Sequence, residues 1–468
     1  MSDLAMTIDG AAAPTHATFD VVDPSTGSVF ASAPECTPAQ LDDSLTTARA
    51  AYQEWRRDEG ARRKLMVEAA EAILAAIDDI APLLTQEQGK PLAESQAEVR
   101  ATAIWLKYFA GLEVEDEVIQ DDDKASIIVH RRPLGVVAAI TPWNFPLSLA
   151  AWKIAPALRA GNTMVLKPSP YTPLATLALG RVLSGVLPPG VLNVISGSDP
   201  LGALLTSHPV PRKISFTGSV ATGKHVAAAA APDLKRITLE LGGNDPAILL
   251  DDIDAAEIAE PLFWSAFRNN GQVCSAVKRV YAPEHRYDEV VDALAAVAAQ
   301  TRVGVGFDPS VRLGPLNNRP QLDRVSNLVR AAVSDGAEAV TGGSPLDGDG
   351  FFYGPTILRG ATDGMAVVDE EQFGPVLPVV SYRTVEEAVE RANGTQFGLS
   401  GSVWGQDADR AAAVADELDC GTVWVNTHLA LRPDQPFGGA KWSGIGVENG
   451  HWGLRSFTEV KVLHRSRA

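Results

Sequence analysis

The chain has 468 residues, 46% of them hydrophobic and 21% charged, which is typical of a soluble globular protein with about three domain-sized units. Its formal net charge of −18 argues against nucleic acid or an anionic membrane as a partner, because both would repel it. Three cysteines provide no disulfide framework, and the N-terminus carries acidic residues where a signal peptide would carry basic ones, so we expect a reducing, cytoplasmic setting.

The first part of the chain predicts a strand pair followed by helices. Weak alternation around residues 19–22 leads into a turn signal at 23–27, and Thr37 followed by Pro38 is typical of a helix start. Alanine-rich helical periodicity then continues to about residue 109. We expect the acidic stretch 113–123 to be a solvated loop and residues 126–131 to form a strand that projects from the body.

From residue 135 short apolar strands alternate with helical segments, an order that predicts a parallel sheet covered by helices on both faces. The expected strands are residues 135–141, 163–167, 192–196, 213–218 and 236–241, and the expected helices are 147–159, 174–184 and 220–230. A second α/β series runs from 247 to about 447, with strands at 278–281, 352–358, 378–382 and 422–426. The tail, residues 458–463, alternates like a strand that pairs at a sheet edge.

Residues 133–152 carry no charge and have the length of a membrane span. Pro142, Asn144 and Pro146 lie in the middle of this stretch and favour a buried strand, a turn and a helix start instead. We therefore expect no membrane partner.

Glu240 and Cys274 are the residues that suggest chemistry first. Glu240 ends an apolar strand, and Cys274 lies in a glycine-containing loop beside Asn270, Gln272 and Ser275. A lone cysteine is usually a small buried apolar residue, but these neighbours suggest a polar, accessible thiol. A thiol near a carboxylate can attack a carbonyl carbon, and the carboxylate can then take a proton from water to hydrolyse the thioester.

Two strand ends suggest further binding groups. Asn144 follows a strand where ligands bind in open α/β folds, and its amide could donate to an oxyanion, although a turn asparagine that satisfies backbone is the simpler reading on its own. Gly218 and Gly223 flank a helix start whose backbone amides suit a pyrophosphate. This loop does not match the dinucleotide-binding fingerprint and alone is more often a plain helix start.

Together these segments resemble the aldehyde dehydrogenase superfamily, and the resemblance covers nearly the whole chain in the family's order. The motifs that carry it are Pro142-Trp143-Asn144-Phe145-Pro146, Lys167-Pro168-Ser169, Phe216-Thr217-Gly218-Ser219, Leu239-Glu240-Leu241-Gly242-Gly243, Gly271-Gln272-Val273-Cys274, Glu371-Gln372-Phe373-Gly374-Pro375 and Pro436-Phe437-Gly438-Gly439. The resemblance implies a Rossmann-like parallel-sheet cofactor domain (residues 1–114 and 134–242), an α/β catalytic domain (243–457) and a small β extension for oligomerisation (115–133 and 458–468).

The resemblance also implies a role for each matching residue. Cys274 is expected to be the nucleophile, Glu240 the general base, and Asn144 with the backbone N–H of Cys274 the oxyanion site. Lys167 would bind the adenosine ribose of NAD, Ser219 the pyrophosphate and Glu371 the nicotinamide ribose, while Glu448 would belong to a supporting polar path. The remaining cofactor-site residues are expected to be Thr141, Trp143, Lys153, Ser169, Gly218, Gly223, Leu241 and Phe373.

These parts imply oxidation of an aldehyde to an acid. Attack by Cys274 gives an alkoxide that Asn144 stabilises, hydride leaves to the nicotinamide, and water activated by Glu240 releases the acid from the thioester. Family members that pass the acyl group to coenzyme A lack this glutamate, so its presence favours hydrolysis. Alternatives are a thiol esterase or acyl transferase that uses the Cys-Glu pair, or a non-catalytic binding protein.

Two positions depart from the family pattern. Pro170 stands where NAD-preferring members carry a glutamate that repels a 2′-phosphate, so NAD is favoured here while NADP use stays open. Arg268 stands where many members carry an apolar lining of the substrate tunnel, and it could pair with the carboxylate of a semialdehyde or simply form a structural ion pair. For Arg432, near Asp434, the structural ion pair is favoured.

Phe145, Trp152, Trp264 and Phe437 are expected beside the substrate. The eight histidines are scattered without metal-ligand spacing, so no metal site is predicted, although His428 could approach the tunnel mouth. The resemblance implies a homodimer or homotetramer through the projecting strand and the tail.

Overall fold

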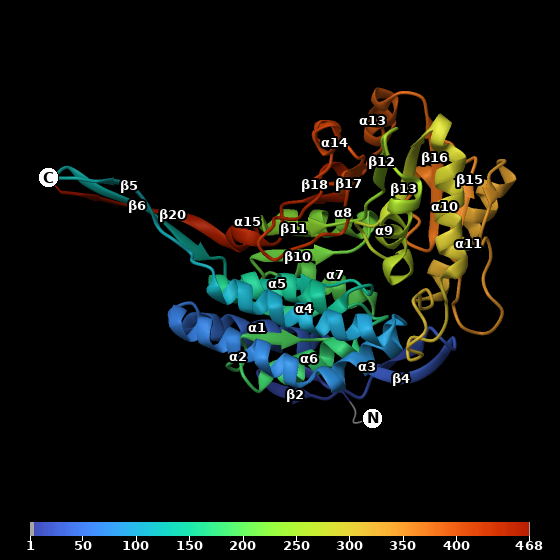
Figure 1. The fold of residues 1–468 in the computed structure, drawn as a ribbon. Helices are drawn as coiled ribbons and strands as arrows, with labels where there is room; N and C mark the ends of the chain where they lie inside the picture. Colours follow the sequence, from blue (N-terminus) through green and yellow to red (C-terminus); the bar gives the residue numbers. More distant parts are fainter. Residues whose placement is uncertain (1–3, 468) are drawn as a thin grey trace.

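The computed structural model describes residues 4–467 and contains two large sheets with helices packed around them (Figure 1). The first sheet has the strand order β19-β11-β10-β7-β8-β9-β1-β2. Its parallel centre consists of β7 (Val136–Ile140), β8 (Thr163–Lys167), β9 (Leu192–Val194), β10 (Lys213–Thr217) and β11 (Arg236–Glu240). Antiparallel strands β1 (Met6–Ile8), β2 (Ala11–Ala13) and β19 (Gly444–Ile445) complete it.

The helices that accompany this sheet are α1 (Pro38–Trp55), α2 (Glu59–Ala75), α3 (Ile77–Gln88), α4 (Leu92–Gly111), α5 (Pro146–Ala160), α6 (Leu174–Ser184), α7 (Asp199–Ser207) and α8 (Val220–Ala230), followed by the short 3₁₀ turn η1 (Ala231–Asp233). Helix α1 begins where the sequence predicts: the Thr37 hydroxyl accepts from the Gln40 N–H, and the Gln40 side chain accepts from the Thr37 N–H. Helix α5 begins at Pro146, directly after the turn that carries Asn144.

The second sheet has the order β14-β15-β16-β13-β12-β17-β18 and is parallel except for β14. Its strands are β12 (Asp245–Leu249), β13 (Val277–Pro283), β14 (Glu338–Ala339), β15 (Thr356–Arg359), β16 (Val376–Tyr382), β17 (Ser400–Trp404) and β18 (Thr422–Val425). Its helices are α9 (Ala255–Phe267), η2 (Arg268–Gly271), η3 (Glu284–Arg286), α10 (Tyr287–Gln300), α11 (Arg319–Ser334), α12 (Ala366–Asp369), α13 (Val385–Asn393) and α14 (Ala408–Ala415). The chain then returns through η4 (Lys441–Ser443), β19 and α15 (Gly450–Arg455), so β19 joins the first sheet although it follows the second in sequence.

A three-stranded antiparallel sheet projects from the body and ends at the C-terminus (Figure 1). It consists of β5 (Glu117–Asp121), β6 (Ala125–Pro133) and β20 (Thr458–Ser466), in the order β20-β6-β5. The expectation that residues 113–123 form a solvated loop is wrong at its centre, because β5 pairs there with β6. The acidic side chains indicated a solvated loop. Strand β5 is mostly exposed, so it forms through backbone pairing with β6 rather than through a buried face.

A separate hairpin, β3 (Thr18–Asp23) and β4 (Ser28–Pro34), matches the strand pair expected near the N-terminus. The uncharged stretch 133–152 holds β7, the turn and the start of α5. No helix among the described residues 4–467 has the length and apolarity needed to cross a membrane.

Candidate active site

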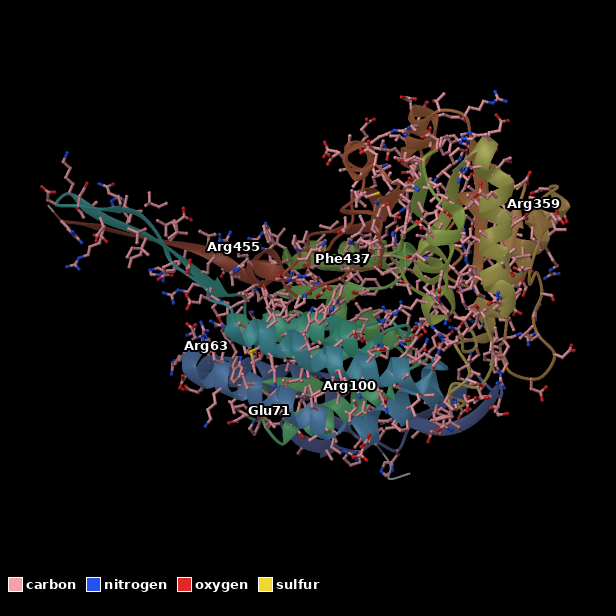
Figure 2. All side chains as sticks on the ribbon, in the orientation of Figure 1. Arg63, Glu71, Arg100, Arg359, Phe437 and Arg455 are labelled. Atoms are coloured by element: carbon pink, nitrogen blue, oxygen red, sulfur yellow. The ribbon has the colours of Figure 1, made fainter. Side chains whose placement is uncertain are left out.

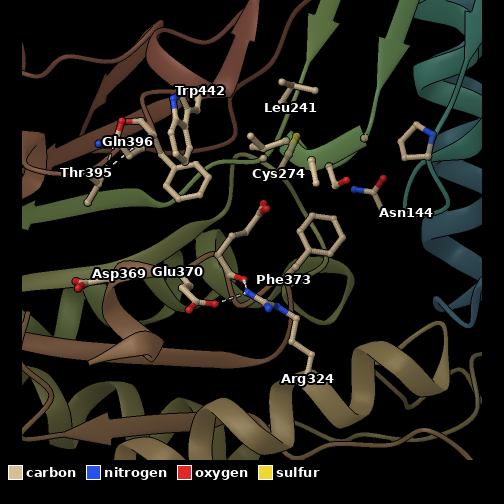
Figure 3. A pocket seen from close by; sticks show the side chains of 18 of the residues that line it. Asn144, Leu241, Cys274, Arg324, Asp369, Glu370, Phe373, Thr395, Gln396 and Trp442 are labelled. Carbon is tan, nitrogen blue, oxygen red and sulfur yellow. Dashed lines mark hydrogen bonds and ion pairs between the residues drawn. The ribbon is translucent and has the colours of Figure 1, made fainter. Parts of the chain in front are cut away.

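A cleft of about 960 Å³ separates the carboxyl edge of the first sheet from the second sheet (Figure 3). Asn144, Ser219 and Leu241 line it from the first side, and Glu371 and Phe373 line it from the other. Cys274 also lines the cleft and, in Figure 3, lies beside Leu241 with Asn144 across from it. Ligands of open α/β sheets bind at this edge, so the cleft has the expected place for a dinucleotide.

The loop before Cys274 has an uncommon backbone. Asn269 and Asn270 both have positive φ, 49° and 57°, a conformation that asparagine tolerates better than most residues. This shape turns the polar side chains of the loop inward: Asn270, Gln272 and Ser275 are each only 1% exposed. Gln272 is held there because its Oε1 accepts from the Asn317 N–H at 2.8 Å.

The Cys274 thiol is therefore less accessible than its polar neighbours suggest. Cys274 is half-buried and packs against the hydrophobic core of the first sheet, because its polar neighbours face into the protein. Burial raises the pKa of Cys274 to about 12, against the opposing effect of the Lys278 charge. At neutral pH the residue is a thiol, and attack on a carbonyl requires removal of its proton.

Asn144 is fixed by its own backbone as well as by its side chain. Its carbonyl oxygen accepts from Lys90 Nζ at 2.8 Å and from Asn269 Nδ2 at 3.0 Å. Its side-chain Nδ2 donates to the Gln272 carbonyl at 2.8 Å, two residues before Cys274. An amide nitrogen carries two protons, so one remains available for an oxyanion formed on Cys274.

Glu240 is 4% exposed, and neither of its carboxylate oxygens has a hydrogen-bond partner. Burial raises the pKa of Glu240 well above its usual range, the negative charge of Glu448 adds to this, and Lys153 opposes it. A buried carboxyl without hydrogen bonds can serve as a proton acceptor of high affinity for a water molecule.

A buried ion pair lies beneath Glu240. Lys153 Nζ donates to Glu448 Oε1 at 2.7 Å and to the Thr217 hydroxyl at 2.7 Å, and both charged side chains are fully buried. Lys153 was expected at the cofactor site, but it does not line the cleft and instead supports the strands that carry Glu240. Glu448 is the buried carboxylate that holds Lys153 in this pair.

The N-terminus of α8 lines the cleft where an anion could bind. Ser219 caps this helix by accepting from the Thr222 N–H at 3.2 Å, and Gly218, Ser219, Val220 and Ala221 line the cleft. The helix packs closely against the residue that follows β11, since a Cβ at Gly223 would meet the Leu241 side chain at 2.5 Å. A helix N-terminus with free amides favours a pyrophosphate.

The opposite wall holds Glu371 and Phe373. Glu371 Oε1 accepts from the Gly243 N–H at 3.2 Å, and a Cβ at Gly242 would overlap the Glu371 carboxylate, so only glycine leaves room for it. Phe373 has a φ of 52° and meets the Trp143 ring edge to face, with the ring centroids 5.2 Å apart. Aromatic rings and a carboxylate in one cleft fit the flat ring and ribose hydroxyls of a nicotinamide nucleotide.

Three expected cofactor residues lie at the ends of β7 and β8 in the first sheet and do not line the cleft. Thr141 is 1% exposed, and Ser169 accepts from the Tyr171 N–H at 3.3 Å. Lys167 is 3% exposed and donates to the Pro168 carbonyl at 3.3 Å. Burial lowers the pKa of Lys167 to about 8, and the carboxylates of Asp199 and Glu35 oppose this.

The residues expected beside the substrate are mostly packed in the interior. Trp152 stacks on Trp105 at 5.8 Å and meets Phe437 edge to face at 5.5 Å, and Phe437 lies in the middle of the body (Figure 2). Phe145 is half-buried with Lys90 Nζ 3.9 Å from its ring centroid. None of these rings lines the cleft, whereas Leu149, which the sequence analysis did not single out, lines it together with Asn144 and Cys274.

The charged candidates divide as follows. Arg268 is exposed at the start of η2. Burial raises the pKa of Glu94, and the positive charges of Lys90 and then Arg268 oppose this rise. Arg432 pairs with Asp434 at 2.8 Å on the surface, as expected. His428 is 8% exposed, Nε2 lies 2.7 Å from the Ser275 carbonyl, and burial lowers its pKa to about 3. The described residues contain no group of three or more potential metal ligands.

Several supporting residues were missed. Lys90, Asn269 and Gln272 hold Asn144, and they come from segments that only the fold brings together. Lys278, four residues after Cys274, was the one recognisable signal, because a buried cation near a cysteine favours the thiolate.

Residues 12–463 match the aldehyde dehydrogenase family. The chain is 38% identical to human retinaldehyde dehydrogenase 3 over 95% of its own length and 89% of that protein. It is also 38% identical to glutarate-semialdehyde dehydrogenase of Pseudomonas aeruginosa, over 95% of this chain and 94% of that protein. The NAD+ complex of an aldehyde dehydrogenase from Bacillus cereus superposes with a TM-score of 0.97 at 35% identity, covering 99% of this chain and 97% of that one.

Proposed function

The chain belongs to the aldehyde dehydrogenase family and oxidises an aldehyde to the carboxylic acid with NAD(P), and we propose that Cys274, Glu240 and Asn144 carry out this reaction. Cys274 loses its proton to solvent, and its sulfur bonds to the carbonyl carbon. The free Nδ2 proton of Asn144 stabilises the negative oxygen that forms. A nicotinamide dinucleotide bound in the cleft supplies the hydride acceptor, and this oxidation leaves a thioester on Cys274.

Hydrolysis of the thioester needs a base. The Glu240 carboxylate takes a proton from water, the water oxygen bonds to the acyl carbon, and the carbon–sulfur bond breaks to release the acid and the Cys274 thiolate. The observation that carries this assignment is the Glu240 carboxyl itself, which is buried with both oxygens unpaired. A carboxyl held this way for structural reasons would be expected to have hydrogen-bond partners.

Rapid mixing with aldehyde and NAD tests the two roles separately. Glu240→Gln should form reduced cofactor in a first-turnover burst and then nearly stop, since acylation is intact and hydrolysis is not. Cys274→Ser should lose both phases. Cys420→Ser is the matched control, because burial also raises the pKa of Cys420 to about 12 but this thiol does not line the cleft. A steady rate unchanged in Glu240→Gln would refute the base assignment.

NAD is proposed as the preferred cofactor. Pro170 cannot repel a 2′-phosphate, but Asp199 at the start of α7 and Glu35 both place negative charge near Lys167. Their repulsion would act where the family resemblance puts the adenosine ribose. This supports NAD over NADP without excluding activity with NADP.

A semialdehyde is proposed as the substrate class. The support is the exposed Arg268 at the start of η2, together with the relative named for glutarate semialdehyde. Arg268→Leu should raise the KM for succinic semialdehyde at least tenfold more than the KM for a neutral aldehyde of similar length. Arg432→Leu, which removes an exposed guanidinium paired with Asp434, should change neither. Equal effects of Arg268→Leu on both aldehydes would leave Arg268 with a structural role.

The remaining expectations concern the assembly and its surroundings. A homo-oligomer through the projecting sheet is proposed, because β20 is an edge strand with exposed apolar side chains. The proposed domain division keeps residues 1–114 and 134–242 for the cofactor, 243–457 for catalysis, and 115–133 with 458–468 for association. The mechanism needs Cys274 in its reduced form, so we also propose a reducing, cytoplasmic setting.

A further inference from the structure

A buried lysine, Lys278, holds the turn that carries Cys274 (residues 273–276). Lys278 lies near the start of β13, is 2% exposed and does not line the cleft. Its Nζ donates to the carbonyl of Val273, the residue before Cys274, and to the carbonyl of Ala276 at 3.4 Å. The Ala276 N–H also donates to the Val273 carbonyl, at 3.2 Å. The side chain of Lys278 therefore joins the two ends of this turn.

The carbonyls in the middle of the turn are held as well. His428 Nε2 lies 2.7 Å from the Ser275 carbonyl. The Cys274 carbonyl packs against Gly243, where a Cβ would come within 2.6 Å of it. Burial lowers the pKa of His428 to about 3, and the charge of Lys278 adds to this, so His428 is neutral at pH 7. Lys278 is thus the charged donor that acts on the turn.

The charge of Lys278 has no ion-pair partner among residues 4–467. The carboxylates that face it are Asp245, at the start of β12, and Glu371. Both are bonded elsewhere: Asp245 Oδ2 accepts from the Ser400 hydroxyl, and Glu371 Oε1 accepts from the Gly243 N–H at 3.2 Å. A buried cation without a paired anion is costly, which suggests that its charge serves more than packing.

This charge acts on the nucleophile and on the acids around it. Burial raises the pKa of Cys274 to about 12 and the pKa of Asp245 to about 7, and the charge of Lys278 is the main opposing effect on both. The same holds for Glu371, whose pKa burial also raises. Burial lowers the pKa of Lys278 in turn, and the charges of these three groups oppose it. Glu240 is the further carboxylate that disfavours the Cys274 thiolate.

We propose that Lys278 is a positioning residue for the nucleophile, whose ammonium holds the Cys274 turn and stabilises the thiolate that attacks the aldehyde. The inference rests on the proposed role of Cys274. Lys278 exchanges no proton in this role: the thiol proton leaves to solvent, and the sulfur bonds to the carbonyl carbon beside a fixed positive charge. The same charge stabilises the thiolate again when it leaves the thioester. A neutral side chain could close the turn, but it could not supply this charge.

Alkylation of the cofactor-free enzyme by iodoacetamide tests the role of the charge, because only the thiolate reacts. At about pH 8.5, Lys278→Met should lower the alkylation rate of Cys274 at least about fivefold and slow the first-turnover burst of reduced cofactor. Lys278→Arg keeps a fixed charge and its donors, so its alkylation rate should stay within about threefold of the unmodified enzyme. Mass spectrometry of the peptide that contains Cys274 measures the rate.

The matched control is a second buried lysine. Lys213 is 1% exposed, but its Nζ donates to the Thr238 hydroxyl on β11 and does not act on the Cys274 turn. Lys213→Met should therefore leave the alkylation rate of Cys274 unchanged. Thermal melting of each variant checks that a lower rate does not reflect unfolding.

Asp245→Asn provides a change of opposite sign without touching Lys278. At about pH 8.5, above the pKa of about 7, the Asp245 carboxylate is ionised and disfavours the Cys274 thiolate. Asparagine removes this charge and still offers an oxygen to the Ser400 hydroxyl, so alkylation should become about two- to threefold faster. This variant keeps the inference testable if a Lys278 variant does not fold.

The outcomes separate the inference from the function on which it rests. An unchanged alkylation rate in Lys278→Met would overturn the role of Lys278. Equal losses in Lys278→Met and Lys278→Arg, with no gain in Asp245→Asn, would also overturn it, because the turn would then depend on the shape of Lys278 and not on its charge. If Cys274→Ser still reduced the cofactor, the nucleophile assignment would fail instead, whatever the Lys278 variants did.

Discussion

At the residue scale, burial shifts the pKa of both reacting groups upward. It raises the pKa of Cys274 to about 12 and the pKa of Glu240 well above its usual range, so burial disfavours the charged form of each. The sequence could identify both residues, because each lies in a motif with a recognisable chemical purpose. It could not give these pKa shifts, which depend on burial in the fold and, for Glu240, also on the charge of Glu448, far along the chain.

This state of Cys274 predicts a steep pH dependence of thiol reactivity. Only the thiolate reacts with iodoacetamide, so the alkylation rate of the cofactor-free enzyme should rise about tenfold per pH unit from pH 7 to 9, without a plateau. Mass spectrometry of the peptide that contains Cys274 measures the rate, with Cys274→Ser as the blank. A plateau below pH 8 would show that another group activates the thiol.

Asp199 offers a second test at this scale, on cofactor choice. Removing its charge should weaken the repulsion of a 2′-phosphate near Lys167, so Asp199→Asn should lower the preference of kcat/KM for NAD over NADP several-fold, mainly through KM for NADP. Asp42→Asn is the matched control, since Asp42 bonds His208 at the other end of α7. An unchanged ratio in Asp199→Asn would remove Asp199 from cofactor recognition.

At the scale of elements, the predictable part of the fold is the part with local signals. The strands and helices between residues 135 and 241 follow the alternation of the sequence closely, and the capping residues of α1 mark its start. Strand β17 was not predicted, because Ser400, Gly401 and Ser402 give no apolar alternation. It becomes a buried inner strand only by pairing with β12 and β18, which come from distant parts of the chain.

The turn that carries Asn144 depends on contacts between elements. Glu98 of α4 accepts from the Leu147 and Ser148 N–H groups at the start of α5, and it pairs with Lys90, which in turn binds the Asn144 carbonyl. Both charges are almost fully buried, with 0% and 2% of their side chains exposed. This arrangement holds the turn from behind, and no local sequence signal reveals it.

Breaking this pair should cost both stability and activity. Glu98→Ala removes the carboxylate that pairs with the buried Lys90, so the free energy of unfolding should fall by about 3–5 kcal/mol. Asn144 should lose its fixed position, and kcat should fall with it. Urea unfolding and steady-state rates measure the two effects. Glu68→Ala, which removes a surface ion pair with Lys64, should cost no more than about 1 kcal/mol.

At the scale of the whole molecule, the projecting sheet is the feature that a single chain does not explain. Strands β5 and β20 are exposed on nearly their whole length, while β6 between them is half-buried. The exposed strands carry Val118, Ile119, Val460, Val462 and Leu463, each more than half exposed. Apolar side chains gathered on an arm that leaves the body are expected to meet another surface. Strand β20 also lies at the edge of its sheet, and an edge strand can pair with a strand of another chain.

Association through this arm can be tested by adding charge to it. Val460→Lys combined with Val462→Lys should turn the proposed oligomer into a monomer, because two buried ammonium groups would oppose the contact, while β20 still pairs with β6. Light scattering coupled to gel filtration measures the mass. Leu234→Lys, at a loop residue that is 84% exposed, is the control and should leave the oligomer intact. A monomeric unmodified enzyme, or an oligomer that survives the double substitution, would show that this arm does not join the subunits.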